Sequence, residues 1–128
     1  MALSKDAILA AKDTDVHEID VPEWGGSILL RSMTGAQRNN YEHWAHKQSN
    51  LKSPDYRGIR ERLIISCAVD ADGKPLFTED DLASLSDKNS EVIDRLHAKS
   101  RLICGIDDAL REKSARASDP RKPRQRSE

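Results

Sequence analysis

The stretch Val-His-Glu-Ile-Asp-Val-Pro-Glu-Trp-Gly-Gly-Ser-Ile-Leu-Leu-Arg, residues 16–31, decides the fold. Apolar and polar side chains alternate in its first part, which is the pattern of a half-buried strand. A turn rich in proline and glycine separates this part from a second short apolar segment. The sequence therefore predicts a β-hairpin over about 15–32. Because an isolated hairpin is barely stable in water, we expect a helix to cover it.

A helix is predicted to follow the hairpin over about 34–48. Thr34 and Gln37 have the spacing of a capping box, in which each side chain accepts a hydrogen bond from the backbone N–H of the other residue. The apolar side of this helix is short and consists of Tyr41, Trp44 and Ala45. Much of its remaining surface is polar.

The next segment, 55–69, carries one helical stripe of apolar residues. Its members lie three, four and four residues apart and are Tyr56, Ile59, Leu63 and Cys67. Pro54 is the expected first helical residue. The β-branched end of the segment leaves a strand as the alternative to a helix. Residues 70–75 combine aspartates, a glycine and a proline, which predicts a turn that ends this element.

Two more helices are predicted after this turn, over about 78–85 and 88–110. Thr78 is the expected N-cap of the first, since acidic residues follow it where the helix dipole favours them. The second keeps helical apolar spacing, and Gly105 is expected to end or weaken it.

A short helix over about 4–12, with Ser4 as its N-cap, is predicted before the hairpin. Together these elements predict an α+β fold that is mostly helical, with four to five helices and one N-terminal β-hairpin. The length of 128 residues fits one domain, which we place at 1–113. Since only 4% of the residues are aromatic, we expect a thin aliphatic core and few large ligand pockets.

The end of the chain differs from the rest in charge. Residues 111–128 hold seven basic and three acidic side chains, a balance of +4, which leaves −5 on the remainder because the net charge is −1. Residues 114–128 lack apolar periodicity and are predicted to be a disordered basic tail. No apolar run reaches the roughly 18–20 residues needed to cross a bilayer, and no signal peptide is recognisable. We expect the protein to stay in the compartment where it is made.

No constellation of residues predicts catalysis, a cofactor or a bound metal. His43 and His46 have a spacing that fits a metal ion, but no second pair of ligands is evident, so solvated surface histidines are the preferred interpretation. Cys67 and Cys104 lie in apolar runs and are predicted to be free, buried thiols rather than a disulfide. We therefore expect a protein that binds other proteins and is not an enzyme.

Five short motifs follow one another along the chain: VPEWGG at 21–26, MTGAQR at 33–38, RERLI at 60–64, VDADGKPLFTEDD at 69–81 and LASL at 82–85. In this order they resemble the tail assembly chaperones of bacteriophages with long, non-contractile tails (the siphovirus type). The resemblance covers about residues 15–110 and includes neither the short first helix nor the basic tail.

The resemblance implies a chaperone that binds the tape-measure protein, keeps it soluble and helps to recruit major tail subunits during tail assembly. It also implies action in the host cell cytoplasm and absence from the mature virion. In many such phages a ribosomal frameshift near the end of the gene yields a longer form with a C-terminal extension. A flexible tail from Ser114 would suit the junction with such an extension. The alternatives are a structural phage tail or head–tail connector protein and, less favoured, a nucleic-acid-binding regulator that uses the basic tail.

Six residues are candidates for partner binding: Trp24, Tyr41, Trp44, Arg121, Lys122 and Arg124. Tryptophan is enriched at binding hot spots, although a core position is the favoured alternative for both tryptophans. The helices over 34–48 and 88–110 are expected to offer part of the surface for the tape-measure protein. Whether the protein also associates with copies of itself stays open. Nucleic acid is disfavoured as a partner because the tail lacks aromatic residues for base stacking.

Overall fold

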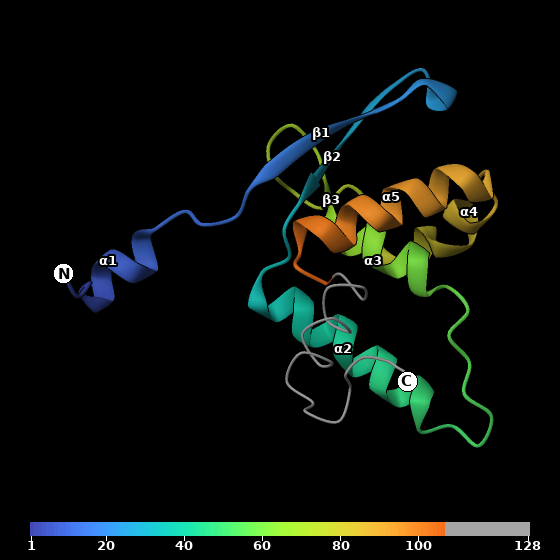
Figure 1. The fold of residues 1–128 in the computed structure, drawn as a ribbon, viewed down its shortest axis with the longest axis horizontal. Helices are drawn as coiled ribbons and strands as arrows, with labels where there is room; N and C mark the ends of the chain where they lie inside the picture. The colour runs from blue at the N-terminus through green and yellow to red at the C-terminus, as the bar shows by residue number, and fades with distance from the viewer. Residues whose placement is uncertain (107–128) are drawn as a thin grey trace, which may run out of the picture.

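The computed structural model describes residues 1–106, which form a helical body joined to a small antiparallel sheet (Figure 1). The α-helices are α1 (Lys5–Ala10), α2 (Gly35–Ser49), α3 (Ile59–Cys67), α4 (Leu82–Ser86) and α5 (Ser90–Ile103). The strands are β1 (Val16–Val21), β2 (Gly26–Arg31) and β3 (Ala68–Val69), and two 3₁₀ turns are η1 (Pro22–Trp24) and η2 (Glu79–Asp81). The predicted mostly helical α+β class with an N-terminal hairpin is confirmed. Within residues 1–106, no helix is both long and apolar enough to cross a bilayer.

The predicted hairpin is formed by β1 and β2, which pair antiparallel with Val16 opposite Arg31 and Val21 opposite Gly26. Their connection is η1, closed by Gly25 at a φ of 78°. This left-handed conformation favours glycine, because a side chain there is strained. The turn residues of the sequence were therefore sufficient to predict the hairpin.

The predicted helix over 55–69 is wrong at both ends. At its start, the Asp55 carboxylate accepts the backbone N–H of Arg57 at 3.0 Å, and Gly58 takes a φ of 86° just before α3 begins. Pro54 is therefore not the first helical residue. At its end, residues 68–69 leave the helix and pair with β2 as the third strand of the sheet, whose order is β1-β2-β3. The strand alternative is correct for these two residues, since the exposed edge of β2 offers them backbone partners.

The core lies where α3 and α5 pack together and against β2, and α5 runs alongside α3 in Figure 1. Leu30 of β2, Leu63 and Ile64 of α3, and Leu96 of α5 are all 0% exposed. Burying each such side chain contributes roughly 1.5–3 kcal/mol. These aliphatic residues form the thin core that the composition predicts.

Helix α5 ends at Ile103, earlier than the predicted end at 110. Gly105 adopts a φ of 71°, and the N–H of Ile106 donates to the carbonyl of Arg101 at 2.7 Å, which is the bond pattern of a Schellman motif. The Ile106 side chain then folds back into the core. The remainder of the predicted helix and the predicted disordered tail over 114–128 lie outside the described residues.

The two short helical segments begin with the N-cap residues that the sequence predicts. In α1, the Ser4 hydroxyl accepts the N–H of Ala7 at 3.1 Å, and every residue of the helix is exposed; Figure 1 shows α1 lying away from the body. The predicted helix over 78–85 starts with a capping box between Thr78 and Asp81. Its first turn is η2, and α-helical geometry begins only at Leu82.

Candidate partner-binding site

Helix α2 is fixed at its start, yet it buries none of its residues. The predicted capping box is confirmed, since the Gln37 N–H donates to Thr34 Oγ1 at 3.2 Å and the Thr34 N–H donates to Gln37 Oε1 at 2.9 Å. One turn further on, Arg38 donates to the carbonyl of Cys104 at 3.3 Å. The capping residues thus fix the first turn of α2. In the later turns Tyr41 packs against the edge of the core, although no residue of the helix is fully buried.

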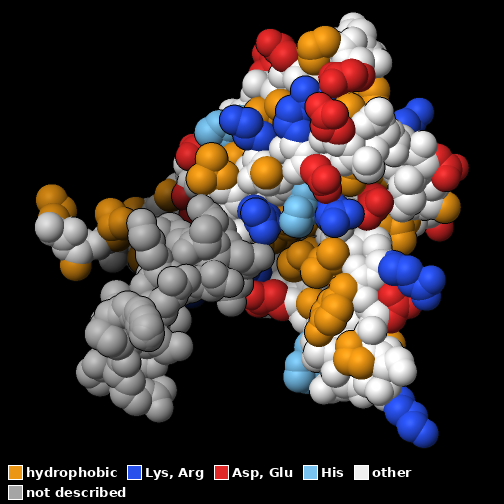
Figure 2. Space-filling model, turned by 45° about the vertical axis from the view of Figure 1, so that its right-hand side comes forward, with side chains coloured by type: hydrophobic (Ala, Val, Ile, Leu, Met, Phe, Trp, Pro, Cys, Tyr) orange, Lys and Arg blue, Asp and Glu red, His pale blue; other side chains and the backbone are white. Residues whose placement is uncertain are grey.

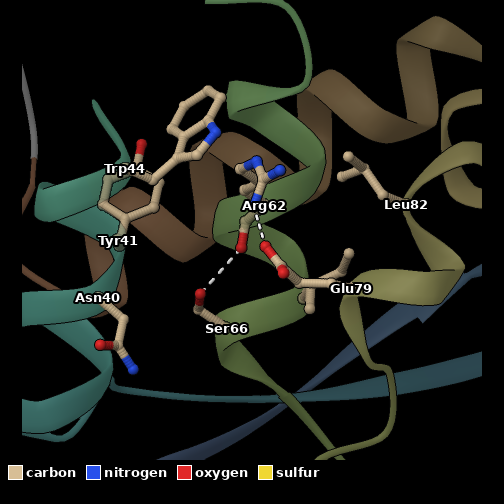
Figure 3. A pocket seen from close by; sticks show the side chains of 8 residues that line it. Asn40, Tyr41, Trp44, Arg62, Ser66, Glu79 and Leu82 are labelled. Carbon is tan, nitrogen blue, oxygen red and sulfur yellow. Dashed lines mark hydrogen bonds and ion pairs between the residues drawn. The ribbon is translucent and has the colours of Figure 1, made fainter. Parts of the chain in front are cut away.

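A cavity of about 370 Å³ lies between α2, α3 and the η2–α4 segment (Figure 3). Its lining combines aromatic and aliphatic side chains with polar ones and consists of Asn40, Tyr41, Trp44, Arg62, Ile65, Ser66, Glu79 and Leu82. Figure 3 shows Tyr41 and Trp44 projecting from α2 on one side and Leu82 on the other, with Arg62 between them. Its volume is at the small end of the range for ligand pockets.

Arg62 is the central polar residue of this cavity. Its guanidinium carbon lies 4.5 Å from the centroid of the Trp44 ring, a cation–π geometry. Its Nη1 donates to the carboxylate of Glu79. The hydroxyl of Ser66 donates to the backbone carbonyl of Arg62 at 2.9 Å, as the dashed lines in Figure 3 mark. A side chain of α3 therefore connects α2 to η2.

These contacts leave the cavity easy to reorganise. The side chain of Glu79 is 77% exposed and that of Arg62 is 24% exposed. An ion pair with an exposed carboxylate such as that of Glu79 contributes about 0–1 kcal/mol, so a partner that brings its own group can replace it at low cost. Arg62 is largely buried, and its cation–π contact with Trp44 is the harder of the two to replace.

Hydrophobic side chains also gather on the surface at this level of the molecule. Figure 2 shows orange side chains in its lower half, the height at which α2 lies in Figure 1, with blue, red and pale blue side chains around them. An apolar patch with a charged rim is the anatomy of a surface that binds another protein.

A second cavity, of about 490 Å³, lies beside the hairpin turn and contains Trp24, Phe77 and Leu85. Glu23 on its rim accepts a hydrogen bond from Arg95 of α5 at 2.8 Å, which holds the pKa of this carboxyl below its ordinary value. The same contact ties the hairpin turn to α5. Trp24 is 37% exposed, so it is neither fully buried nor fully exposed to solvent.

The chain matches the family model for phage tail assembly chaperones over residues 4–116. It belongs to that family. The structure of the bacteriophage HK97 tail assembly chaperone has a similar fold, with a TM-score of 0.51 and 23% sequence identity, and the match covers 74% of this chain and 88% of that chain. No curated protein matches the sequence. Assistance in tail assembly is not an enzymatic role, and it implies tail proteins as partners.

The chaperone brings some of the predicted site residues together and separates others. Tyr41 and Trp44 share the cavity beside α2, whereas Trp24 belongs to the cavity at the hairpin turn. The three predicted basic residues, Arg121, Lys122 and Arg124, lie outside the described residues. Their role in partner binding stays a prediction.

Sequence reasoning did not select Arg62 or Glu79 as site residues. The helical spacing of Arg62 and Ser66 places both on one side of α3, which was a usable signal. The pairing of Arg62 with Glu79 joins positions 17 residues apart, and no local pattern predicts such a contact. The cavity depends on this tertiary pairing.

The described part of the chaperone holds no group of three or more metal-ligating side chains. His46 of the candidate histidine pair lies 3.1 Å from the amide nitrogen of Asn50, in the last turn of α2. This ordinary side-chain contact gives His46 a structural role at the helix end.

Proposed function

We propose that the chaperone binds the tape-measure protein of a phage with a long, non-contractile tail, keeps it soluble and helps to recruit major tail subunits. It acts in the host cytoplasm and leaves before the particle is complete. The observation that supports this proposal is the cavity between α2 and α3, in which Tyr41 and Trp44 stand beside the Arg62–Glu79 pair. Tyrosine, tryptophan and arginine are the residue types that dominate binding hot spots.

The cavity suits an amphipathic helix as its occupant. A bulky apolar side chain from such a helix would enter this cavity and pack against its aromatic wall on α2. The neighbouring turns of the bound helix would place charged or amide groups against Arg62 and Glu79 at the rim. A long helical protein that is prone to aggregate presents many such apolar stripes, so several copies of the chaperone can cover one chain.

Helix α5 contributes less to this surface than the sequence predicts. Its apolar residues Val92, Ile93 and Leu96 are at most 3% exposed, because they face α3 and the sheet. Among the described residues of the predicted helix over 88–110, Leu102 is exposed at 63% and stays available for contact. We therefore assign the main partner surface to α2.

Co-expression with the tape-measure protein of the same phage tests the proposal. The wild-type chain is expected to move most of the tape-measure protein into the soluble fraction, and Trp44→Ala is expected to lose most of this effect. Trp24→Ala removes the same side chain from the other cavity and is the matched control, which should retain the effect.

Two outcomes count against parts of the proposal. If the wild-type chain leaves the solubility of the tape-measure protein unchanged, the partner is wrong. If Trp44→Ala works as well as wild type, the partner stands but the cavity beside α2 is not its site.

Mass spectrometry of purified virions tests the departure from the particle. The proposal expects the chaperone to be absent, whereas a stoichiometric amount would favour a structural tail or head–tail connector protein.

Removal of residues 114–128 tests the predicted role of Arg121, Lys122 and Arg124, since a shortened chain with full solubilising activity would exclude them from the site.

A further inference from the structure

Two cysteines from distant parts of the sequence meet at the ends of α3 and α5. Cys67 is the last residue of α3 and is 0% exposed, and Cys104 is the C-cap of α5 and is half-buried. Their sulfur atoms lie 3.4 Å apart, although the residues are 37 positions apart in sequence. Both thiols are free.

The two thiols have different surroundings. The hydrogen bond from the Cys67 thiol lowers the pKa of Cys104, and the backbone N–H of Met33, 3.4 Å from Cys104 Sγ, acts in the same direction. Cys67 keeps its proton because this bond to Cys104 and its burial both raise its pKa. The pair therefore resembles a nucleophilic thiolate on the accessible side with a protonated thiol behind it.

We propose that Cys67 and Cys104 are a peroxide-reactive dithiol that closes to an intramolecular disulfide. The separation of the sulfurs and the exposure of Cys104 carry this inference. A disulfide needs the sulfurs to approach from 3.4 Å to about 2.0 Å.

The reaction balances with hydrogen peroxide as the oxidant. The Cys104 thiolate attacks one peroxide oxygen, the O–O bond breaks, and the departing hydroxide takes a proton to become water. Cys104 is then a sulfenic acid. The Cys67 sulfur attacks the Cys104 sulfur, the S–O bond breaks, and the leaving hydroxide takes the Cys67 proton as a second water. Two thiols are oxidised by two electrons, and the peroxide is reduced to two waters.

The disulfide would join the C-terminal ends of the two helices that form the core. A bridge across a 37-residue separation restricts the unfolded chain and is expected to raise the melting temperature by roughly 10 °C. In a reducing compartment the bond is transient, since exchange with cellular dithiols reopens it. This inference is independent of the tape-measure proposal.

Treatment of the reduced, purified full chain with hydrogen peroxide tests the inference. Intact mass spectrometry is expected to show a monomer that has lost two hydrogen atoms, with no free thiol left. Its melting temperature should rise, and dithiothreitol should reverse both changes. Cys67→Ser is expected to stop at a sulfenic acid on Cys104 that dimedone traps, and Cys104→Ser to react at least tenfold more slowly.

The inference fails if the wild-type chain gains oxygen atoms without losing two hydrogens, or if only intermolecular dimers form. It also fails if Cys104→Ser reacts at the wild-type rate. The wild-type mass measurement decides the question even if one serine variant does not fold.

Discussion

Helices α2 and α5 have nearly the same length, 15 and 14 residues, but they differ in how much they contribute to the core of the chaperone. α5 presents an apolar stripe to α3 and buries Val92, Ile93, Leu96 and Ser100. α2 buries no residue and carries the aromatic wall of the candidate site. The fold rests on the helix with a regular apolar stripe. The helix with little apolar periodicity stays at the surface, where we propose that a partner binds.

The largest loss of stability is expected from a substitution on the side of α5 that faces the core. Leu96→Ala removes a side chain that is 0% exposed and leaves a cavity, so the free energy of unfolding should fall by about 2–5 kcal/mol. Urea denaturation measures this change. Leu102→Ala is the matched control on the same helix, because Leu102 is 63% exposed, and its effect should stay within about 0.5 kcal/mol. Equal losses for the two variants would contradict the assignment of α5 to the core.

The regular spacing on α5 also explains how much of the fold was predictable. The apolar stripe of α5, the turn residues of the hairpin and the capping box of α2 are local signals, and each predicted its element. The failed end of the helix over 55–69 depends on a contact distant in sequence, whereas its failed start depends on the local turn at Asp55 and Gly58. Residues 68–69 become a strand because β2 lies beside them. The β-branched end of 55–69 leaves a strand as an alternative but does not decide between strand and helix.

The candidate site was predictable only in part, because two of its residues meet only through tertiary packing. Tyr41 and Trp44 are the large apolar residues of a mostly polar helix, and this contrast identified them. Arg62 and Glu79 became site residues only through the packing of α3 against α4 and η2. Trp24 was chosen by residue type alone, and residue type does not say which cavity a side chain joins.

A smaller effect is expected from the cap that fixes α2. Thr34→Ala removes the oxygen that accepts the Gln37 N–H, which should lower the free energy of unfolding by about 1 kcal/mol. Chemical denaturation detects a change of this size. Ser53→Ala removes a hydroxyl from an exposed loop position and is the control, with no measurable change expected. A loss above about 3 kcal/mol for Thr34→Ala would mean that α2 belongs to the core after all.

The ion pair beside α2 should contribute still less to stability. Glu79→Gln removes the negative charge that Arg62 contacts, and since Glu79 is 77% exposed the free energy of unfolding should fall by about 0.5 kcal/mol. This loss should shrink when the same urea titration is repeated at high salt, because salt screens exposed charges. Asp80→Asn removes one charge from the same turn without contacting Arg62 and serves as the control. If the two variants lose equal stability at every salt concentration, the Arg62–Glu79 pair contributes nothing of its own.

The smallest effect is expected in the segment that joins α2 to α3. There the side-chain hydrogen bond from Arg57 lowers the pKa of Asp55 to about 2, below the ordinary value of 3.8. A depressed pKa in the folded state adds stability that is present above pH 3.8 and is lost as the pH falls toward 2. The Arg57 side chain is 90% exposed and that of Asp55 is 37% exposed, so solvent screens the pair and this contribution is small. An NMR titration of the Asp55 carboxyl is the sensitive measurement.

Arg57→Gln is expected to return the Asp55 pKa toward its ordinary value and to leave neutral-pH stability nearly unchanged. Arg60→Gln removes the same charge three residues later, where the partner is Asp94, and should leave the Asp55 titration as it is in wild type. If both variants shift the Asp55 pKa equally, the cause is the general positive charge around α3 and not the direct hydrogen bond. The Asp55 side chain would then hold the joining segment mainly through the hydrogen bond that its carboxylate accepts from the backbone N–H of Arg57.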